Sequence, residues 1–184
     1  MRKLALALAA SGLFALSVPA QPAAAAFETF EAKSAAADAA ELARQDMAEA
    51  FGGKRLKPGQ YVWRDVSSSG EPRVVVSLDD QLMFLYKGDT LVAVSTISSG
   101  TAKNPTPTGI FPILQKKKFH RSIKYDNAPM PFMQRIDKYG IALHGGHLPG
   151  YPASHGCIRL PGQFAAKLFA VTDVGTPVLV GSVS

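Results

Sequence analysis

The sequence predicts a mainly β domain, a sandwich or a barrel, with an additional N-terminal helix. From Gln60 onward, short runs of β-branched and aromatic residues alternate with Gly and Asp turn signals. One stretch of helical periodicity interrupts these runs, and a longer Ala-rich stretch precedes them. Many short strands with a single helix are typical of all-β sandwiches and barrels.

Residues 1–26 have the pattern of a secretory signal peptide. Arg2 and Lys3 form a short basic region, an apolar run follows, and consecutive alanines at the end fit a small-residue cleavage site. The apolar run is short for a membrane-spanning helix, which needs about 20 residues. We therefore expect cleavage after Ala26, export to the periplasm or the cell wall, and no stable membrane span after cleavage.

Residues 27–59 are expected to form a helical arm and a linker. Residues that favour helix dominate 27–51, and Gly52-Gly53 supplies a stop before the linker at 54–59. Two interpretations of the helix are open: it packs on the domain or acts as a spacer, or it is a docking arm for a partner.

The domain itself is expected at residues 60–184. Turn signals at 79–80 and 88–89 join neighbouring strands as hairpins. Residues 161–171 begin with Pro and carry apolar residues on one helical face. The expected strands are 61–63, 73–78, 81–86, 91–97, 110–115, 140–143 and 177–180.

Length and charge restrict the class of protein. A chain of 184 residues has the size of one domain with a core. The formal net charge of +6 suits a polyanionic wall or an acidic peptide. The run Lys116-Lys117-Lys118 lacks the interleaved aromatic residues of a nucleic-acid site and is expected as a solvated strand end. No nucleic-acid partner is therefore expected.

Cys157 is the only cysteine of the chain, so it cannot form an internal disulfide. Thiol catalysis needs a nucleophile, a base that takes its proton, and backbone donors for the oxyanion. His144 lies thirteen positions upstream as a possible base, and Gly156 lets the chain pass closely behind the thiol. The alternative is an inert buried cysteine. The Gly and His neighbours favour a reactive one.

The residues around Cys157 resemble the active-site motif of the L,D-transpeptidase catalytic domain (YkuD) family. That motif has a histidine, here in His144-Gly145, and after a loop Ser/Thr-His-Gly-Cys, here residues 154–157. The compact spacing is similar to that of a Leu-Pro-Gly-Tyr-Pro-Ala-Ser-His-Gly-Cys subgroup. The resemblance extends upstream to motifs at 98–100 and 105–111, so that it covers most of the expected domain.

The resemblance implies an L,D-transpeptidase-like β-sandwich or barrel and a cysteine acyltransferase that acts on peptidoglycan stem tetrapeptides. The reaction would cut the bond between the third residue and terminal D-Ala and leave a thioester at Cys157. A second amine then gives a 3→3 cross-link, or an outer-membrane protein lysine or a free D-amino acid is the acceptor. With water as the acceptor, the enzyme is an L,D-carboxypeptidase. The resemblance implies no cofactor and no metal.

The resemblance also implies roles for the motif residues. Cys157 is expected as the nucleophile, with a thiol pKa lowered by a neighbouring imidazole, and His144 as the base. The carbonyl of Gly145 is expected to orient the His144 ring. The N–H groups of Gly156 and Cys157 are the expected oxyanion donors, and His155 holds the loop or lines the pocket.

Five further residues are candidates for substrate contact. Arg159, which stands where many family members have Asn, either grips a substrate carboxylate or forms an internal salt bridge. Ser154 either hydrogen-bonds within the loop or acts in catalysis. Residues 118–132, rich in Pro and aromatic residues, are expected to cover the cleft as a lid. The other three candidates are Tyr151, His147 and Met130.

Two other classes of function stay open. One is a metal-binding protein with ligands of the zinc type, although their spacing is not a recognised zinc pattern. Its ligands would be His144, His147, His155 and Cys157. The other is a wall-binding module without turnover, which nothing in the sequence supports directly.

Overall fold

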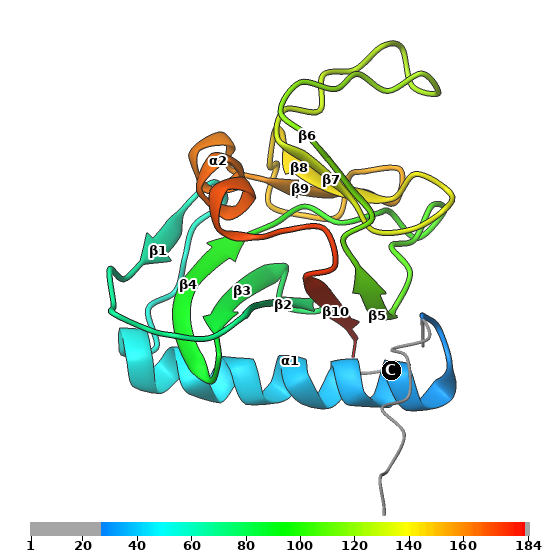
Figure 1. Cartoon of the computed structure of the whole chain (residues 1–184). Coiled ribbons are helices and arrows are strands. Elements are labelled where there is room, and N and C mark those ends of the chain that lie inside the picture. The colour runs from blue at the N-terminus through cyan, green and yellow to red at the C-terminus, as the bar shows by residue number, and fades with distance from the viewer. Residues whose placement is uncertain (1–26, 183–184) are drawn as a thin grey trace, which may run out of the picture.

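Two β-sheets and two helices make up residues 27–182, the part of the chain that this computed structural model describes; the expected signal peptide lies outside it. Helix α1 (Phe30–Phe51) runs along the bottom of the view in Figure 1, and a six-stranded sheet lies on it. A four-stranded sheet and helix α2 (Gly162–Val171) form the upper layer. The fold is mainly β with an N-terminal helix, as predicted. No helix within the described range is long and apolar enough to cross a membrane.

The strands pair in two separate sheets. In the larger sheet the spatial order is β1 (Tyr61–Trp63), β4 (Thr90–Thr96), β3 (Leu82–Lys87), β2 (Pro72–Ser77), β10 (Pro177–Gly181) and β5 (Gly109–Pro112). In the smaller sheet the order is β6 (Gln115–Lys117), β7 (Met133–Arg135), β8 (Ala142–Gly145) and β9 (Ile158–Leu160). Strand β10 is parallel to β2, and β9 is parallel to β8; the other pairs are antiparallel.

The central strands of the larger sheet are buried on both faces. Val74 and Val76 of β2 join the core between the two sheets. Val75 points the other way, into the apolar cluster between the larger sheet and α1. On β3, Met83 likewise points into the core between the sheets, and Phe84 points into the cluster against α1. Because successive residues of a strand face opposite sides, burial of both faces makes these strands continuous apolar runs.

Helix α1 lies close to the larger sheet because its buried face carries small side chains. At its start Thr29 Oγ1 accepts a hydrogen bond from the Ala32 amide, and Gly52 ends it with a φ of 66°. A Cβ added to Gly181 of β10 would lie 2.3 Å from the Ala36 carbonyl oxygen, so only glycine fits there. The helix therefore packs on the domain. Its buried residues are Ala32, Ala36, Ala40, Ala43 and Met47.

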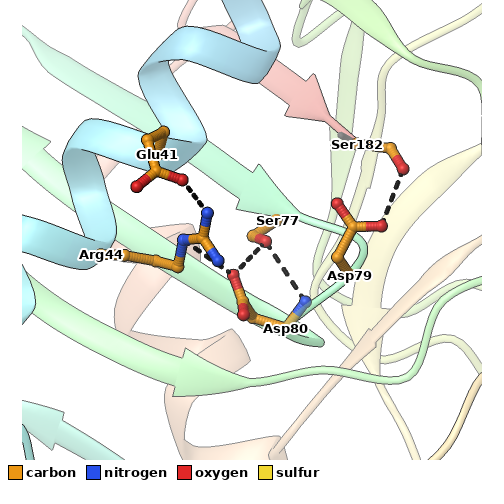
Figure 2. Close-up of polar contacts among 6 residues, drawn as sticks. All are labelled: Glu41, Arg44, Ser77, Asp79, Asp80 and Ser182. Carbon is orange, nitrogen blue, oxygen red and sulfur yellow. Dashed lines mark hydrogen bonds and ion pairs between the residues drawn. The ribbon is translucent and has the colours of Figure 1, made fainter. Parts of the chain in front are cut away.

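Polar contacts fasten the middle of α1 to the turn between β2 and β3 (Figure 2). Arg44 pairs with Glu41 on the helix, and its Nε lies 3.5 Å from Asp80 Oδ2 in the turn. Ser77 Oγ donates a hydrogen bond to the same Asp80 oxygen at 2.6 Å. Solvent-exposed ion pairs contribute about 1 kcal/mol or less. These contacts therefore orient the helix, while apolar burial supplies most of its stabilisation.

The observed strands differ from the predicted ones at several places. The stretch expected as one strand, 110–115, is divided into β5 and β6, which belong to different sheets. The chain crosses between the sheets at Ile113 and Leu114, whose amides donate to the Thr176 and Arg135 carbonyls at 2.9 and 2.7 Å. The sequence pattern does not predict β7 or β9, because these three-residue strands lack the run of β-branched and aromatic residues found in β1.

Lys116 does not belong to a solvated strand end, contrary to the prediction. Its Nζ donates a hydrogen bond to the Phe169 carbonyl at 2.8 Å and another to the Thr172 carbonyl, at the C-terminal end of α2. A cation in this place satisfies carbonyls that the helix leaves without a partner. Lys117 and Lys118 are exposed, as predicted. Lys116 thus ties β6 to α2.

Truncation of the buried face of α1 should destabilise the whole domain. We expect Met47→Ala to lower the free energy of unfolding by about 2–5 kcal/mol, because truncation of this buried side chain leaves a cavity between α1 and the sheet. Leu42→Ala on the same helix, where the side chain is 59% exposed, should stay within about 0.5 kcal/mol. Urea unfolding followed by circular dichroism measures both variants. Equal values for the two would contradict the packing of α1.

Candidate active site

The parallel pair β8 and β9 places His144 and Cys157 on the same face of the smaller sheet. Leu143 and Ile158 lie opposite each other in this pair, and both are buried in the core between the sheets. Side chains alternate along a strand. His144, which follows Leu143, and Cys157, which precedes Ile158, therefore point to the other face. Arg159, opposite His144, does the same.

A cleft of about 960 Å³ lies over this outer face. Strand β7 contributes Met133 and Arg135 to its lining, and Gln115 comes from β6. The segment 118–132, expected to cover the cleft as a lid, contributes several residues to the cleft lining. In Figure 1 the connection between β6 and β7 reaches away from the body of the molecule. Lid residues in the lining include His120, Ser122, Ile123, Lys124, Tyr125 and Met130.

His144 is buried and held in one orientation. Its Nδ1 lies 2.9 Å from the Gly145 carbonyl oxygen, and because a carbonyl only accepts, Nδ1 carries the proton. Nε2 is then left as the basic nitrogen. Burial lowers the pKa of His144 most strongly; the Gly145 carbonyl raises it, and electrostatic interactions with Arg159 and His120 lower it further. His144 is therefore a neutral imidazole at neutral pH.

The Cys157 thiol is also neutral. Its Sγ lies 3.8 Å from the Gly140 carbonyl oxygen. Burial raises the pKa of Cys157 most strongly, a backbone hydrogen bond with Ala142 lowers it, the Asp137 carboxylate raises it, and Arg159 lowers it. The expected lowering of this pKa by an imidazole is wrong for the free protein, because burial penalises the thiolate and His144 is itself uncharged.

The loop before Cys157 is organised by Ser154, whose side chain is buried. Ser154 Oγ accepts a hydrogen bond from the Gly156 amide at 3.1 Å and donates one to the Cys157 carbonyl. The hydroxyl thus has a structural place in the loop. Because the Gly156 amide is already engaged, it does not serve as an oxyanion donor in this conformation, contrary to the prediction. Of the two predicted oxyanion donors, only the Cys157 amide is left as a candidate.

Two residues to which the sequence analysis gave no role, Thr106 and Gln81, connect this loop by hydrogen bonds to the segment 99–100. Thr106 Oγ1 accepts from the Gly100 amide at 2.9 Å and donates to the Gly156 carbonyl at 2.8 Å. Gln81 binds the Ser99 amide through Oε1 at 3.0 Å, and the Ser99 carbonyl accepts from the Ser154 amide at 2.9 Å. The signal for Thr106 is its place in the upstream motif at 105–111, whereas Gln81 gives no local signal.

Gly156 needs the conformational freedom of glycine. Its φ is 106°, and an added Cβ would lie 2.6 Å from Ile141 Cδ1. The backbone behind the thiol therefore runs against the turn that precedes β8. This observation agrees with the predicted close passage of the chain at Gly156.

Arg159 forms no ion pair with any residue in the range 27–182, where the salt bridges involve Arg44. Its aliphatic stem packs over Gly146, at which a Cβ would lie 3.3 Å from Arg159 Cγ. The side chain lines the cleft. Of its two predicted roles, the internal salt bridge is absent from the described structure, and the guanidinium is available to an anion in the cleft.

The other predicted residues divide between the cleft and the solvent. The His155 ring stacks on Tyr125 of the lid, with ring centroids 4.3 Å apart. His147 is exposed at the cleft, and Met130 is buried against Met133 in a cluster that also contacts Cys157. Tyr151 is 62% exposed and lies outside the cleft lining, so the structure does not bring it to the site.

The described residues contain no group of three or more His, Cys, Asp or Glu side chains arranged to hold a metal ion. His144 already donates through Nδ1 to Gly145, and His155 stacks on Tyr125. The residues named for a zinc site therefore do not converge as a ligand set.

Comparison with known proteins agrees with this geometry. The YkuD family, described as the L,D-transpeptidase catalytic domain, matches residues 71–180, more than half of the chain. The chain belongs to this family. L,D-transpeptidases of this family act on peptidoglycan peptides, and this chain carries the family's catalytic domain around the cleft.

Individual relatives show the same likeness. YkuD of Bacillus licheniformis is 29% identical over 114 residues, which cover 59% of this chain and 64% of the relative. An L,D-transpeptidase from Xylanimonas cellulosilytica is 28% identical with a TM-score of 0.56, covering 74% of this chain and 69% of the solved one. The enzyme Ldtfm is 28% identical with a TM-score of 0.53, covering 60% and 48%. The chain thus spans 64% of the length of its Bacillus relative and about half of the solved Ldtfm chain.

The protonation states predict how this L,D-transpeptidase domain responds to pH. Because the Cys157 pKa is raised, alkylation of the thiol by iodoacetamide should reach half of its maximal rate at a pH above about 8.5, the ordinary pKa of a cysteine thiol. The urea-unfolded chain, in which burial is lost, should show the ordinary midpoint. Intact-protein mass spectrometry across pH measures both rates. A folded-state midpoint near neutrality would instead indicate a preformed thiolate–imidazolium pair.

Proposed function

We propose that this protein is an exported L,D-transpeptidase in which Cys157 attacks peptidoglycan stem tetrapeptides and forms a thioester. The observation that carries the proposal is that His144 on β8 and Cys157, the residue before β9, face the same side of the smaller sheet and line one cleft. Nδ1 of His144 donates a hydrogen bond to the Gly145 carbonyl. Nε2 is therefore the unprotonated nitrogen, which can act as the base. Membership of the family supports the substrate class.

The proposed reaction has two halves. In the first, the Cys157 proton passes to His144 Nε2 as Sγ attacks the carbonyl that precedes terminal D-Ala. The C–N bond breaks, D-Ala leaves as an amine with the proton from His144, and a thioester remains on Cys157. In the second half an acceptor amine attacks the thioester, loses a proton to His144, and restores the thiol by forming a new amide.

A neutral starting pair suits this chemistry. A thiol whose pKa is raised and an imidazole whose pKa is lowered do not exchange a proton in the resting state. The Cys157 proton then passes to His144 while Sγ attacks the substrate carbonyl, because the new C–S bond removes the negative charge from the sulfur. The oxyanion that forms on the substrate needs a donor, for which we propose the Cys157 amide.

Arg159 supports recognition of an anionic substrate. It lines the cleft without an ion pair in the described chain, and a stem peptide carries carboxylates. We propose that its guanidinium binds one of them in bidentate fashion. The net positive charge of the chain also favours an anionic wall.

The acceptor sets the outcome of the second half-reaction. An amine on a second stem gives a 3→3 cross-link, and we propose this as the principal product. A lysine of an outer-membrane protein or a free D-amino acid would use the same thioester. The signal pattern at residues 1–26 supports export to the periplasm or the wall, where such acceptors occur.

Covalent chemistry in a related enzyme supports a reactive centre. Ldtfm, 28% identical to this chain, forms a carbamoyl enzyme with avibactam. By this likeness we expect avibactam and carbapenems to add covalently to Cys157. A wall-binding module without turnover would form no adduct.

A digestion assay tests the proposed function. The mature protein and its Cys157→Ala and Cys157→Ser variants are incubated with purified disaccharide-tetrapeptide, and the products are followed by mass spectrometry. We expect loss of D-Ala together with dimer formation in the wild type, and neither in the variants. Loss of D-Ala without dimers would indicate an L,D-carboxypeptidase or a missing acceptor. Turnover by Cys157→Ala would overturn the assignment of the nucleophile.

The base is tested separately by acylation with a carbapenem. His144→Ala should slow the formation of the covalent adduct roughly 100- to 10,000-fold, the usual contribution of a positioned general base. Unfolding temperatures verify that the variant is folded under the assay conditions. An unchanged rate would exclude His144 as the base and transfer the role to His155 or His147, which line the same cleft.

A further inference from the structure

The turn between β7 and β8 lies directly against the Cys157 thiol. Its Gly140 carbonyl oxygen is 3.8 Å from Cys157 Sγ. Ala142, the first residue of β8, provides a backbone hydrogen bond that lowers the thiol pKa. Since an N–H donor is the backbone group that stabilises a thiolate, the backbone of both residues interacts with the sulfur. A displacement of this turn would therefore change the contacts of the thiol.

A single side chain fixes the turn. Asp137 is buried, and its Oδ1 accepts hydrogen bonds from the amides of Tyr139, Gly140 and Ile141 at 2.9, 2.8 and 2.7 Å. Three charge-assisted bonds to one oxygen make a strong and specific anchor. The turn is also closed by the Ile136 amide, which donates to the Ile141 carbonyl at 2.8 Å. Without Asp137, three consecutive amides would lose their acceptor.

The turn also supports the loop that carries Cys157. The Ile141 side chain occupies the space beside Gly156, where a Cβ would lie 2.6 Å from its Cδ1. The amide of Ile141 is one of the three bound by Asp137. Asp137 thus acts on Cys157 through two contacts of the sulfur and through the backbone immediately before it.

We propose that Asp137 is a positioning residue for Cys157: its carboxylate holds the 138–141 turn so that Gly140, Ile141 and Ala142 keep the thiol in place. The proposal rests on the proposed function in that Cys157 is the nucleophile. Asp137 touches no substrate in this scheme. The strand register already places the thiol on the same face as His144, and the effect of Asp137 is to restrict the position of the thiol on that face.

The carboxylate also acts at a distance, through its charge. Asp137 raises the pKa of Cys157, whereas Arg159 on β9 lowers it. His144 on β8 and His120 on the lid also lie at the site and interact with one another. The other titratable residues in the cleft lining are Lys124, Tyr125, Arg135, Tyr139, His147 and His155. Removing the charge of Asp137 while keeping its oxygen should therefore lower the thiol pKa. Loss of stability alone would not produce that change.

Two substitutions separate the geometric effect from the charge. Asp137→Asn keeps an oxygen that can accept the three amide bonds but removes the charge, whereas Asp137→Ala removes both. Below the unfolding temperature, Asp137→Ala should slow carbapenem acylation roughly 100-fold, as displacements of about 1 Å do. Asp137→Asn should acylate within a few-fold of the wild type. Asp89→Asn, an exposed carboxylate in the β3–β4 turn, is the matched control and should change neither quantity.

The second readout is alkylation of Cys157 by iodoacetamide across pH, which needs no wall substrate. Its midpoint should move to lower pH in Asp137→Asn than in the wild type. The positioning role is overturned if Asp137→Ala, once folded, acylates at the wild-type rate, and an unchanged midpoint in Asp137→Asn would overturn the effect of its charge. If the digestion assay fails while Asp137→Ala still slows carbapenem acylation, the proposed function is wrong and the positioning role stands.

If Asp137→Ala does not fold, Gly140→Ala tests the same turn. Gly140 has a φ of 102°, which is costly for alanine, and an added Cβ meets nothing within 4 Å. The substitution therefore distorts the turn without a clash and without altering the carboxylate. Slower acylation supports the proposal, and a wild-type rate overturns it.

Discussion

The parallel pairing of β8 with β9 is the constraint on which the rest of the site depends. A parallel register aligns Leu143 with Ile158 and commits both to the core. The alternation of side chains then places His144 and Cys157 together on the opposite face. A shift of either strand by one residue would exchange the core residues with the reactive ones. The apolar core between the sheets therefore specifies the reactive pair as well as the stability of the domain.

Burial of that pair decides its charge state. His144 is buried and Cys157 is half-buried, and desolvation makes each more stable in its neutral form. The Gly145 carbonyl leaves one nitrogen of His144 available as a base, and Arg159 adds a positive charge at the cleft. The site therefore combines a neutral nucleophile and base with Arg159, which forms no ion pair with residues 27–182.

The larger sheet and α1 support this site from a distance. The sheet supplies one side of the core, and α1 covers the sheet's other face through alanines that allow a close approach. Inside the domain, Thr106 connects a distant segment of the sequence to the loop before Cys157, and Ser154 stabilises this loop from within. Asp137 performs the corresponding task on the other side of the sulfur. The thiol thus lies between two backbone segments, each held by a buried polar side chain.

The sequence by itself determined the reactive residue types, the motif around Cys157 and His144, the main strands, and the helices at 30–51 and 162–171. These follow from local spacing and composition. Only the tertiary structure decided that β5 and β6 separate, that Tyr151 lies outside the cleft, that the Gly156 amide is engaged, and that Asp137 anchors the neighbouring turn. The tertiary structure also decided that the pKa of Cys157 is raised and not lowered, because burial depends on the fold. Strand partners, burial and hydrogen-bond acceptors are contributed by residues distant along the chain, so no local pattern contains them.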